Sequence, residues 1–238
     1  MSEFSEQKVF DLKSAKRFIG LKSVSYKEYL AARHLFNGNF LHQGAILMNT
    51  SIEKALKVYL LVNDVNIDLA KHDTVKLFRL LEKTSAKIAA SLNSDFLKVL
   101  SKIYLSRYYE KLQTGYNFVI LKNQFLAELD YTFSYLDDLT KFRLGRDKDF
   151  PDSKYNRDKT EQLNVLIENN YITSNISKEQ FLTQSEYVYE FRIAPNHEII
   201  EVLYKTQNTH EPTKFIHEAL KILPDNHSVQ LSQIKSGS

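Results

Sequence analysis

Large apolar side chains recur at spacings of three and four through residues 40–63, FLHQGAILMNTSIEKALKVYLLVN. On an α-helix these spacings place the side chains on one face, so the stretch predicts a helix from about Phe40 to Asn63 with one buried stripe. The stripe consists of Leu41, Ala45, Met48, Ile52, Ala55, Leu56, Tyr59 and Leu60. A helix of this length with one apolar face needs other helices to cover that face, which predicts a bundle.

Four more helices are expected around this one, over residues 26–36, 74–88, 94–112 and 122–144. A weaker amphipathic pattern over residues 6–20 indicates a short leading helix. Ser25 and Glu28 have the spacing of a capping box, which would begin the helix over 26–36. Asp73 and Ser94 are residue types that cap helices, and each precedes an apolar periodic stretch.

The expected fold class is therefore all-α, an antiparallel bundle of about five helices followed by a C-terminal helical extension. The division is expected to be 1–145 for the bundle with its leading segment, 146–159 for a charged linker or loop, and 160–238 for the extension with a frayed end. Within the extension, helices are expected over 160–169, 178–190 behind a Ser177–Gln180 capping box, 197–205 and 212–223. The expected shared core consists of Ile52, Leu56, Leu77, Leu100, Tyr104 and Leu129.

Composition excludes several classes of protein and site. The chain has no Cys, which excludes disulfides, thiolate zinc sites and cysteine nucleophiles. Only six Gly and four Pro are present, which suits long helices. The longest stretch without a formal charge, residues 34–52, is interrupted by Asn, Gln, His and Gly, so no membrane span is expected. With an acidic, polar N-terminus and no signal-peptide pattern, the expected location is cytoplasmic.

Three blocks and their order resemble the HEPN family of helical domains. They are Ala31–Leu35, His42–Ala45 and Ser51–Lys57. Lys71-His72-Asp73 followed by Val75, Leu77 and Leu80 is similar to the family's entry into its third helix. Arg107-Tyr108-Tyr109 lies where one branch of the family carries an Arg-Tyr-Pro signature. The similarity covers about residues 25–145.

The resemblance implies a dimer-forming bundle that binds nucleotides or RNA, frequently beside a nucleotidyltransferase partner. Another branch of the family consists of metal-independent ribonucleases with an Arg-x(4–6)-His motif. Counted from Arg107, the positions for that His hold Leu112, Gln113 and Thr114. The sequence is therefore closer to the Arg-Tyr-Pro branch, although Tyr109 stands where Pro is usual. The absence of His at these positions favours binding over catalysis.

Arg107 is the first candidate ligand-binding residue, together with Tyr108. With Tyr104 and Tyr116 nearby in sequence, a guanidinium and aromatic rings could hold a phosphate and stack a base. The alternative is that Tyr104 and Tyr108, one helical turn apart, are core residues and that Arg107 is a surface charge.

Four cations on the third expected helix form a second candidate, because their spacings of three and four place them on one stripe. They are Lys76, Arg79, Lys83 and Lys87. Such a stripe could follow neighbouring phosphates. It is also what the solvated face of any amphipathic helix looks like.

Two histidines have neighbours that could make them catalytic. Arg192 and His197 have the Arg-x4-His spacing, but a chain of this composition contains one by chance, and a helix start capped by Asn196 is the alternative. His72 beside Asp73 could be a base with its orienting acid, or simply the start of a helix. We expect no catalytic residues, no metal and no cofactor.

The leading hypothesis is a nucleotide- or RNA-binding module that forms a homodimer and has a possible nucleotidyltransferase partner. A metal-independent ribonuclease of the toxin or defence type and a purely structural dimerisation protein are the alternatives.

Overall fold

The computed structural model describes residues 10–69, 71–140 and 153–206. The long helices are α1 (Leu12–Asn37), α2 (Leu41–Val62), α3 (Thr74–Thr84), α5 (Ser94–Leu105) and α6 (Lys122–Leu139). The short ones are α4 (Ala86–Ala90), η1 (Tyr109–Lys111), α7 (Lys154–Thr160), α8 (Asn164–Ile167) and α9 (Lys178–Leu182). The strands are β1 (Asn117–Leu121), β2 (Glu186–Ile193) and β3 (Ile199–Thr206).

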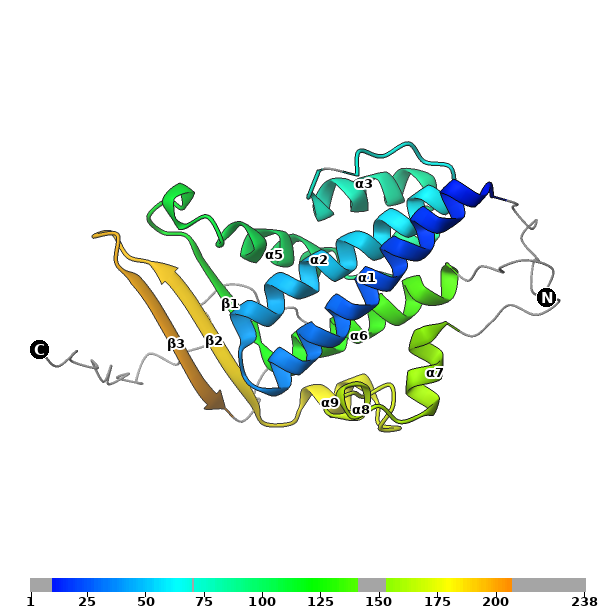
Figure 1. Ribbon diagram of the computed structural model, residues 1–238. Helices are drawn as coiled ribbons and strands as arrows, with labels where there is room; N and C mark the ends of the chain where they lie inside the picture. The colour runs from blue at the N-terminus through cyan, green and yellow to red at the C-terminus, as the bar shows by residue number, and fades with distance from the viewer. Residues whose placement is uncertain (1–9, 70, 141–152, 207–238) are drawn as a thin grey trace, which may run out of the picture.

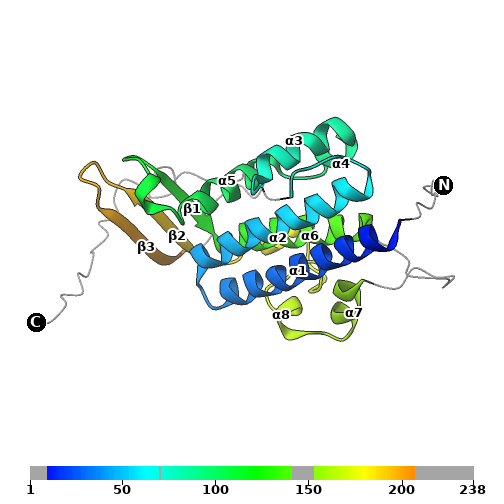
Figure 2. The same ribbon diagram turned by 45° about the horizontal axis from the view of Figure 1, so that its top comes forward.

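The helix α2 lies at the centre of the bundle, as its apolar stripe predicts. It packs against α1, α6, α5 and α3, and Figures 1 and 2 show α1, α2 and α6 running side by side with α3 and α5 on one flank. The short helices α7 and α8 lie on the opposite flank (Figure 2). Five of the six expected core residues belong to one buried cluster, and Tyr104 is buried beside it.

The contact between α1 and α2 is close because Gly44 lacks a side chain. A Cβ at Gly44 would lie 2.3 Å from Cδ2 of Phe36, a ring that is fully buried. Any larger residue there would push the helices apart, which would disturb the packing of the whole bundle.

The expected capping box at Ser25 and Glu28 is wrong. One continuous helix, α1, begins much earlier, where Asp11 accepts hydrogen bonds from the amides of Lys13 and Ser14. Ser25 is mid-helix and bonds the carbonyl of Ser51 on α2, with an Oγ–O distance of 2.7 Å. The polar residues that look like a helix start therefore join two helices.

Two other expected helices are shorter than predicted. The stretch 74–88 divides at Ser85, whose extended backbone separates α3 from α4. The stretch 94–112 ends as α5 at Leu105, and Asn93, not Ser94, caps its start by accepting from the amides of Asp95 and Phe96. Residues 141–144 of the fifth expected helix lie outside the described residues.

The all-α expectation needs correction, because a three-stranded antiparallel sheet is attached to one end of the bundle (Figure 1). The strand order is β1-β2-β3, with Phe118 paired to Phe191 and Tyr189 paired to Leu203. The helices expected over 178–190 and 197–205 are wrong beyond Leu182. Apolar residues there also alternate with period two, and the edge of β1 offers the backbone hydrogen bonds that select strands.

The C-terminal segment also departs in detail from expectation. The capping box at Ser177 and Gln180 is confirmed, but its helix α9 ends at Leu182. Residues 154–160 are helical although they fall in or beside the expected linker. Of the expected helix over 160–169, only Thr160, the last residue of α7, and Asn164–Ile167 are helical. Residues 141–152, like the expected helix over 212–223, lie outside the described residues.

Side chains from both sides of the expected boundary share one core. Tyr155, Leu166 and Phe181 join the buried cluster of the bundle. The division of the chain at 145 stays a prediction.

Candidate functional site

Arg107 lies just beyond the C-terminal end of α5, where the chain turns away from the helix. The preceding residue, Ser106, is fully buried, and its Oγ lies 2.6 Å from Nε2 of His42 and 2.6 Å from the carbonyl oxygen of Ile103. His42 is packed between the rings of Tyr189 and Phe118, and this burial lowers its pKa. The neutral ring of His42 therefore fixes the turn that presents Arg107.

The Arg107 guanidinium is stacked on an aromatic ring. Its Cζ lies 3.5 Å from the ring centre of Tyr104 and 5.3 Å from that of Tyr108. Its Nε donates to the Tyr104 carbonyl at 3.2 Å, and one terminal nitrogen donates to the Tyr108 hydroxyl at 3.3 Å. Within the described residues no carboxylate pairs with Arg107, so its charge remains available to an anion.

The two tyrosines have different environments. Tyr104 is buried, and this burial raises the pKa of its hydroxyl, with Arg107 acting in the opposite direction. Tyr108 is 48% exposed, and Lys111 lies 5.1 Å from its ring centre. The Tyr104 ring therefore lies beneath the Arg107 guanidinium. The Tyr108 ring is exposed, so a nucleobase could stack on it.

His72 approaches the same Tyr104 ring from the segment that precedes α3. The two ring centres are 6.4 Å apart. Nδ1 of His72 lies 3.1 Å from Oε1 of Glu53 on α2, and the carboxylate of Glu53 is buried. A carboxylate is chiefly a hydrogen-bond acceptor, so this contact orients the His72 ring with Nδ1 toward Glu53.

Lys57 completes this arrangement. Its Nζ lies 2.5 Å from Oε1 of Glu53 and 2.9 Å from each of the carbonyl oxygens of Leu69 and Lys71. The Glu53–Lys57 pair is therefore more than the exposed helix pair that its spacing suggests. It fastens the segment before α3 to α2 and so places His72.

We call Glu53, His72, Tyr104, Arg107 and Tyr108 the Arg107 cluster. The structure brings Arg107 and Tyr108 together, as the sequence predicts, and adds Glu53 and His72. Of the two alternatives for His72 and Asp73, the helix start is confirmed, since Asp73 caps α3 by accepting from the amide of Lys76. Glu53 is 19 residues from His72, and the only sequence signal for its role was its place in the block Ser51–Lys57.

Residues 25–131 match the sequence profile of the HEPN domain family. This segment of the chain is a HEPN domain. No curated protein and no solved structure matches the chain. The HEPN domain begins within α1, ends within α6 and includes the whole Arg107 cluster, whereas β2 and β3 lie outside it. The match indicates a nucleotide- or RNA-related module.

Tyr116 does not belong to the Arg107 cluster of this HEPN domain. Its ring packs on Phe118 and Phe191, its hydroxyl donates to the carbonyl of Lys102, and Lys102 lies over its ring. Burial raises the pKa of Tyr116 to about 12. It is a packing residue between the helix α5 and the sheet.

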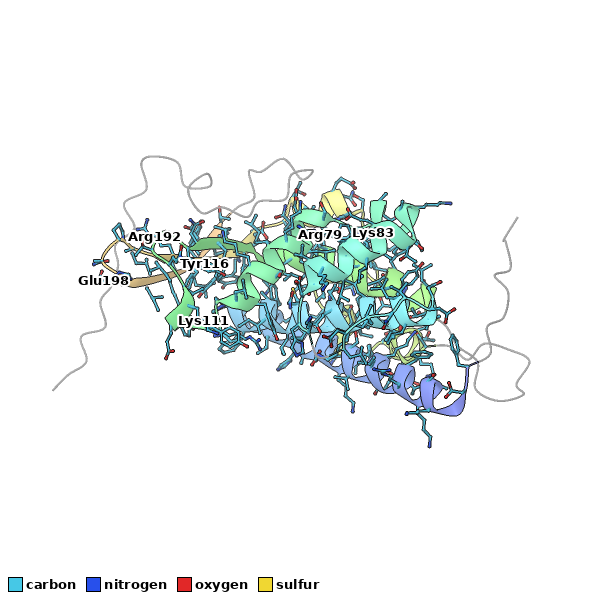
Figure 3. All side chains as sticks on the ribbon, turned by 90° about the horizontal axis from the view of Figure 1, so that it is seen from above. Arg79, Lys83, Lys111, Tyr116, Arg192 and Glu198 are labelled. Atoms are coloured by element: carbon cyan, nitrogen blue, oxygen red, sulfur yellow. The ribbon has the colours of Figure 1, made fainter. Side chains whose placement is uncertain are left out.

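The four cations of the candidate stripe are all exposed, but they do not share one helix. Lys76, Arg79 and Lys83 lie on α3, and Lys87 lies on α4 beyond the break at Ser85. Figure 3 shows Arg79 and Lys83 together on α3, well apart from Lys111 near the sheet. The stripe is thus a basic face of the HEPN domain that is separate from the tyrosine rings around Arg107.

Arg192 and His197 are not arranged as a helix start. Arg192 is exposed on β2, and His197 belongs to the tight turn before β3, where it has a positive φ of 63° and its amide donates to the Ala194 carbonyl. Glu198 follows at the tip of this hairpin (Figure 3). The interpretation of 197–205 as a helix capped by Asn196 is wrong, because this turn joins two strands.

A cleft of about 510 Å³ lies between α6 and α9. In it Glu128 accepts hydrogen bonds from Lys178 at 2.7 Å and from Asn93 at 3.1 Å. These hydrogen bonds join α6 to α9 and to the residue that caps α5. None of the predicted site residues lines it.

Two further properties concern only the described part of the chain. It contains no group of three or more His, Asp or Glu side chains placed to hold a metal ion. None of its helices has the length and apolar character needed to cross a membrane.

Proposed function

We propose that this HEPN domain binds RNA or a nucleotide at the Arg107 cluster, with Arg107 holding a phosphate and Tyr108 stacking on a base. The observation that carries the proposal is the guanidinium of Arg107, fixed on the Tyr104 ring and without a carboxylate partner in the described residues. A cation held in place loses little conformational freedom on binding, which favours affinity. The basic face on α3 and α4 would add sequence-independent attraction for a longer strand.

A homodimer with a possible nucleotidyltransferase partner is part of the same proposal. It rests on membership of the HEPN family and on no contact in the structure. Co-purification of a nucleotidyltransferase with the tagged chain would support this part. A dimer that is indifferent to both RNA and nucleotides would favour the purely structural alternative.

The test is a binding titration of fluorescent single-stranded RNA, and separately of a labelled nucleotide, at two salt concentrations. Arg107→Ala should weaken binding about tenfold or more, because the charge-assisted contact with the phosphate is lost. Arg192→Ala is the matched control, since Arg192 is also exposed but lies on β2. Equal affinities of the wild type and Arg107→Ala would refute the site.

A second candidate function, metal-independent RNA cleavage, has one specific observation in its favour. His72 is oriented by the buried carboxylate of Glu53 and lies against the same ring as Arg107. Its Nε2 could accept the proton of a ribose 2′-hydroxyl, whose oxygen then attacks the adjacent phosphorus and displaces the 5′-oxygen, which takes a proton from water. Arg107 would stabilise the charge on the phosphate.

Cleavage is tested with purified protein and single-stranded RNA in the presence of a chelator. Activity that is lost in His72→Ala and kept in His197→Ala would establish this second function. We expect no cleavage through Arg192 and His197, because Glu190, Glu198 and Glu201 lie in or beside the same hairpin and repel the RNA backbone. Loss of cleavage in a folded His197→Ala variant would contradict that expectation.

A further inference from the structure

The strand β3 has one free edge. Within the described residues it pairs with β2 alone, and it lies on the side of the sheet away from β1 (Figure 1). Ile199 and Leu203 on this strand are each 47% exposed. An eight-residue edge strand with exposed apolar side chains is a template for pairing with another strand.

The orientation of the backbone groups on this edge follows from two hydrogen bonds. The amide of Ile193 donates to the carbonyl of Tyr116, so residue 193 points toward the β1 side, and the amide of Ala194 donates to Glu198, so residue 194 points toward the β3 side. Directions alternate along each strand. The even-numbered residues of β3 therefore bond β2, and the odd-numbered residues direct their amides and carbonyls outward.

Outward groups can meet only outward groups, so in a symmetric antiparallel pair of β3 strands each odd-numbered residue faces an odd-numbered residue of the copy. Centring on Val202 or Tyr204 satisfies this condition but places Leu203 opposite a charged side chain. Centring on Glu201 places two carboxylates against each other, and centring on Lys205 does the same with two ammonium groups. Centring on Leu203 places Leu203 against its own copy. Glu201 of each strand then lies opposite Lys205 of the other strand, which gives two oppositely charged pairs. Opposite charges in facing positions stabilise a strand pair, and like charges destabilise it.

We propose that the outer edge of β3 binds β3 of a second copy of this chain, antiparallel and centred on Leu203, to make one continuous six-stranded sheet. The contact is isologous, as a two-fold dimer requires. The side chains that meet are all exposed in one copy, because Ile199, Glu201, Leu203 and Lys205 lie on one face of β3 with no described element over them. This dimer contact lies outside the HEPN domain and does not depend on the Arg107 cluster.

The absence of cysteine in the chain allows a direct test of register. Leu203→Cys places two sulfurs in facing positions, whose Cα atoms are about 5.5 Å apart in a strand pair of this kind, within the range for a disulfide. Mild oxidation should yield a covalent dimer. Val202→Cys, one residue away, is the matched control, because its copies face Tyr204 and not each other. Failure of Leu203→Cys to cross-link faster than Val202→Cys overturns the proposed register.

A charge exchange tests the same contact without a covalent bond. Glu201→Lys gives four cations at the contact, and Lys205→Glu gives four carboxylates, so each variant alone should dimerise about tenfold or more weakly than the wild type. An equimolar mixture of the two should form a heterodimer, since every facing pair is again of opposite charge. Sedimentation equilibrium measures both effects, with circular dichroism to establish folding.

The wild type should be a dimer in these measurements. A monomeric wild type at the highest soluble concentration overturns the proposal. A dimer that neither single variant weakens also overturns it, and would assign dimerisation to another surface. RNA binding by the Arg107 cluster is measured separately, so the outcomes of the two proposals are distinguishable.

Discussion

Two arginines of the HEPN domain have opposite environments. Arg33 on α1 is fully buried, where it pairs with Asp130 and donates to the carbonyl oxygens of Val165 at 2.7 Å and Glu168 at 2.5 Å. Arg107 is exposed and stacked on Tyr104, and a carbonyl and a phenol accept from it. Arg33 has a protein acceptor for each of its three nitrogens, whereas no carboxylate in the described part of the chain pairs with Arg107.

The difference distinguishes a charge that holds the fold together, on Arg33, from a charge that a ligand could bind, on Arg107. The carboxylate of Asp130 also accepts from Tyr29 at 2.7 Å, so the buried network joins α1, α6 and the segment around α8. Such a network fixes geometry, and removing one member leaves the other charge buried without compensation. A surface guanidinium that is held in place but unpaired contributes little to folding and is free for a ligand.

The largest effect expected from this comparison is on stability. Arg33→Ala should lower the free energy of unfolding by about 3–5 kcal/mol, because Asp130 would stay buried without a partner. Urea unfolding at neutral pH measures this loss. Arg107→Ala is the matched control and should change stability by less than about 0.5 kcal/mol. If the two substitutions cost the same, the distinction between the two arginines fails.

A buried carboxylate whose pKa is raised gives an intermediate effect. Glu186 on β2 accepts from the amide of Asn123 at 2.7 Å and so caps the start of α6, yet burial raises its pKa to about 7. The folded protein therefore binds this proton more tightly than the unfolded chain does. The contribution of Glu186 to the free energy of unfolding falls as pH rises from about 4.5 to about 7, by on the order of 3 kcal/mol.

The substitution Glu186→Gln isolates this contribution. Unfolding free energies of the wild type and the variant, measured between pH 4.5 and 8, should differ in slope, with the wild type losing stability relative to the variant as pH rises. Parallel pH profiles would show that Glu186 titrates normally and is already ionised in the fold at pH 5.

The smallest effect on stability is expected for the basic face. Replacing Lys76, Arg79, Lys83 and Lys87 together by Gln should leave the free energy of unfolding unchanged within about 0.5 kcal/mol, since all four are exposed. If they contact phosphates, the dependence of log affinity for single-stranded RNA on log salt concentration should flatten by up to about 3. An unchanged slope would mean that this face is only solvated.

Sequence periodicity located the bundle well because burial in a helix has a strong local signature. The helix α2 begins and ends within one residue of its expected bounds. Leu56 and Leu129 both lie in the core of the bundle, as expected. Arg107 and Tyr108 lie together because adjacent residues on one turn stay together in any fold, and their role as ligand-binding residues stays a prediction. His42 and Glu53 gained no role from the sequence, because their partners, Ser106 and His72, are distant in the chain.

The β3 segment shows where such reasoning fails. Residues 199–205 are Ile, Ile, Glu, Val, Leu, Tyr and Lys. This order of apolar and charged residues fits an amphipathic helix and a strand about equally. Short apolar segments of this kind are decided by their neighbours. The edge of β1 and the tight turn at His197 supply the decisive hydrogen bonds, and both are products of the folded chain.

The sequence alone determined that this protein is a mainly helical bundle with an arginine and tyrosines at the end of its fourth long helix. Those features depend on residues three to four apart, whose contacts are set by helix geometry. Tertiary structure alone decided that Arg33 is buried with Asp130, that His72 is held by Glu53, and that β3 pairs with β2 alone among the described residues. These depend on pairs of residues that only the packing of the bundle and the pairing of the strands bring together.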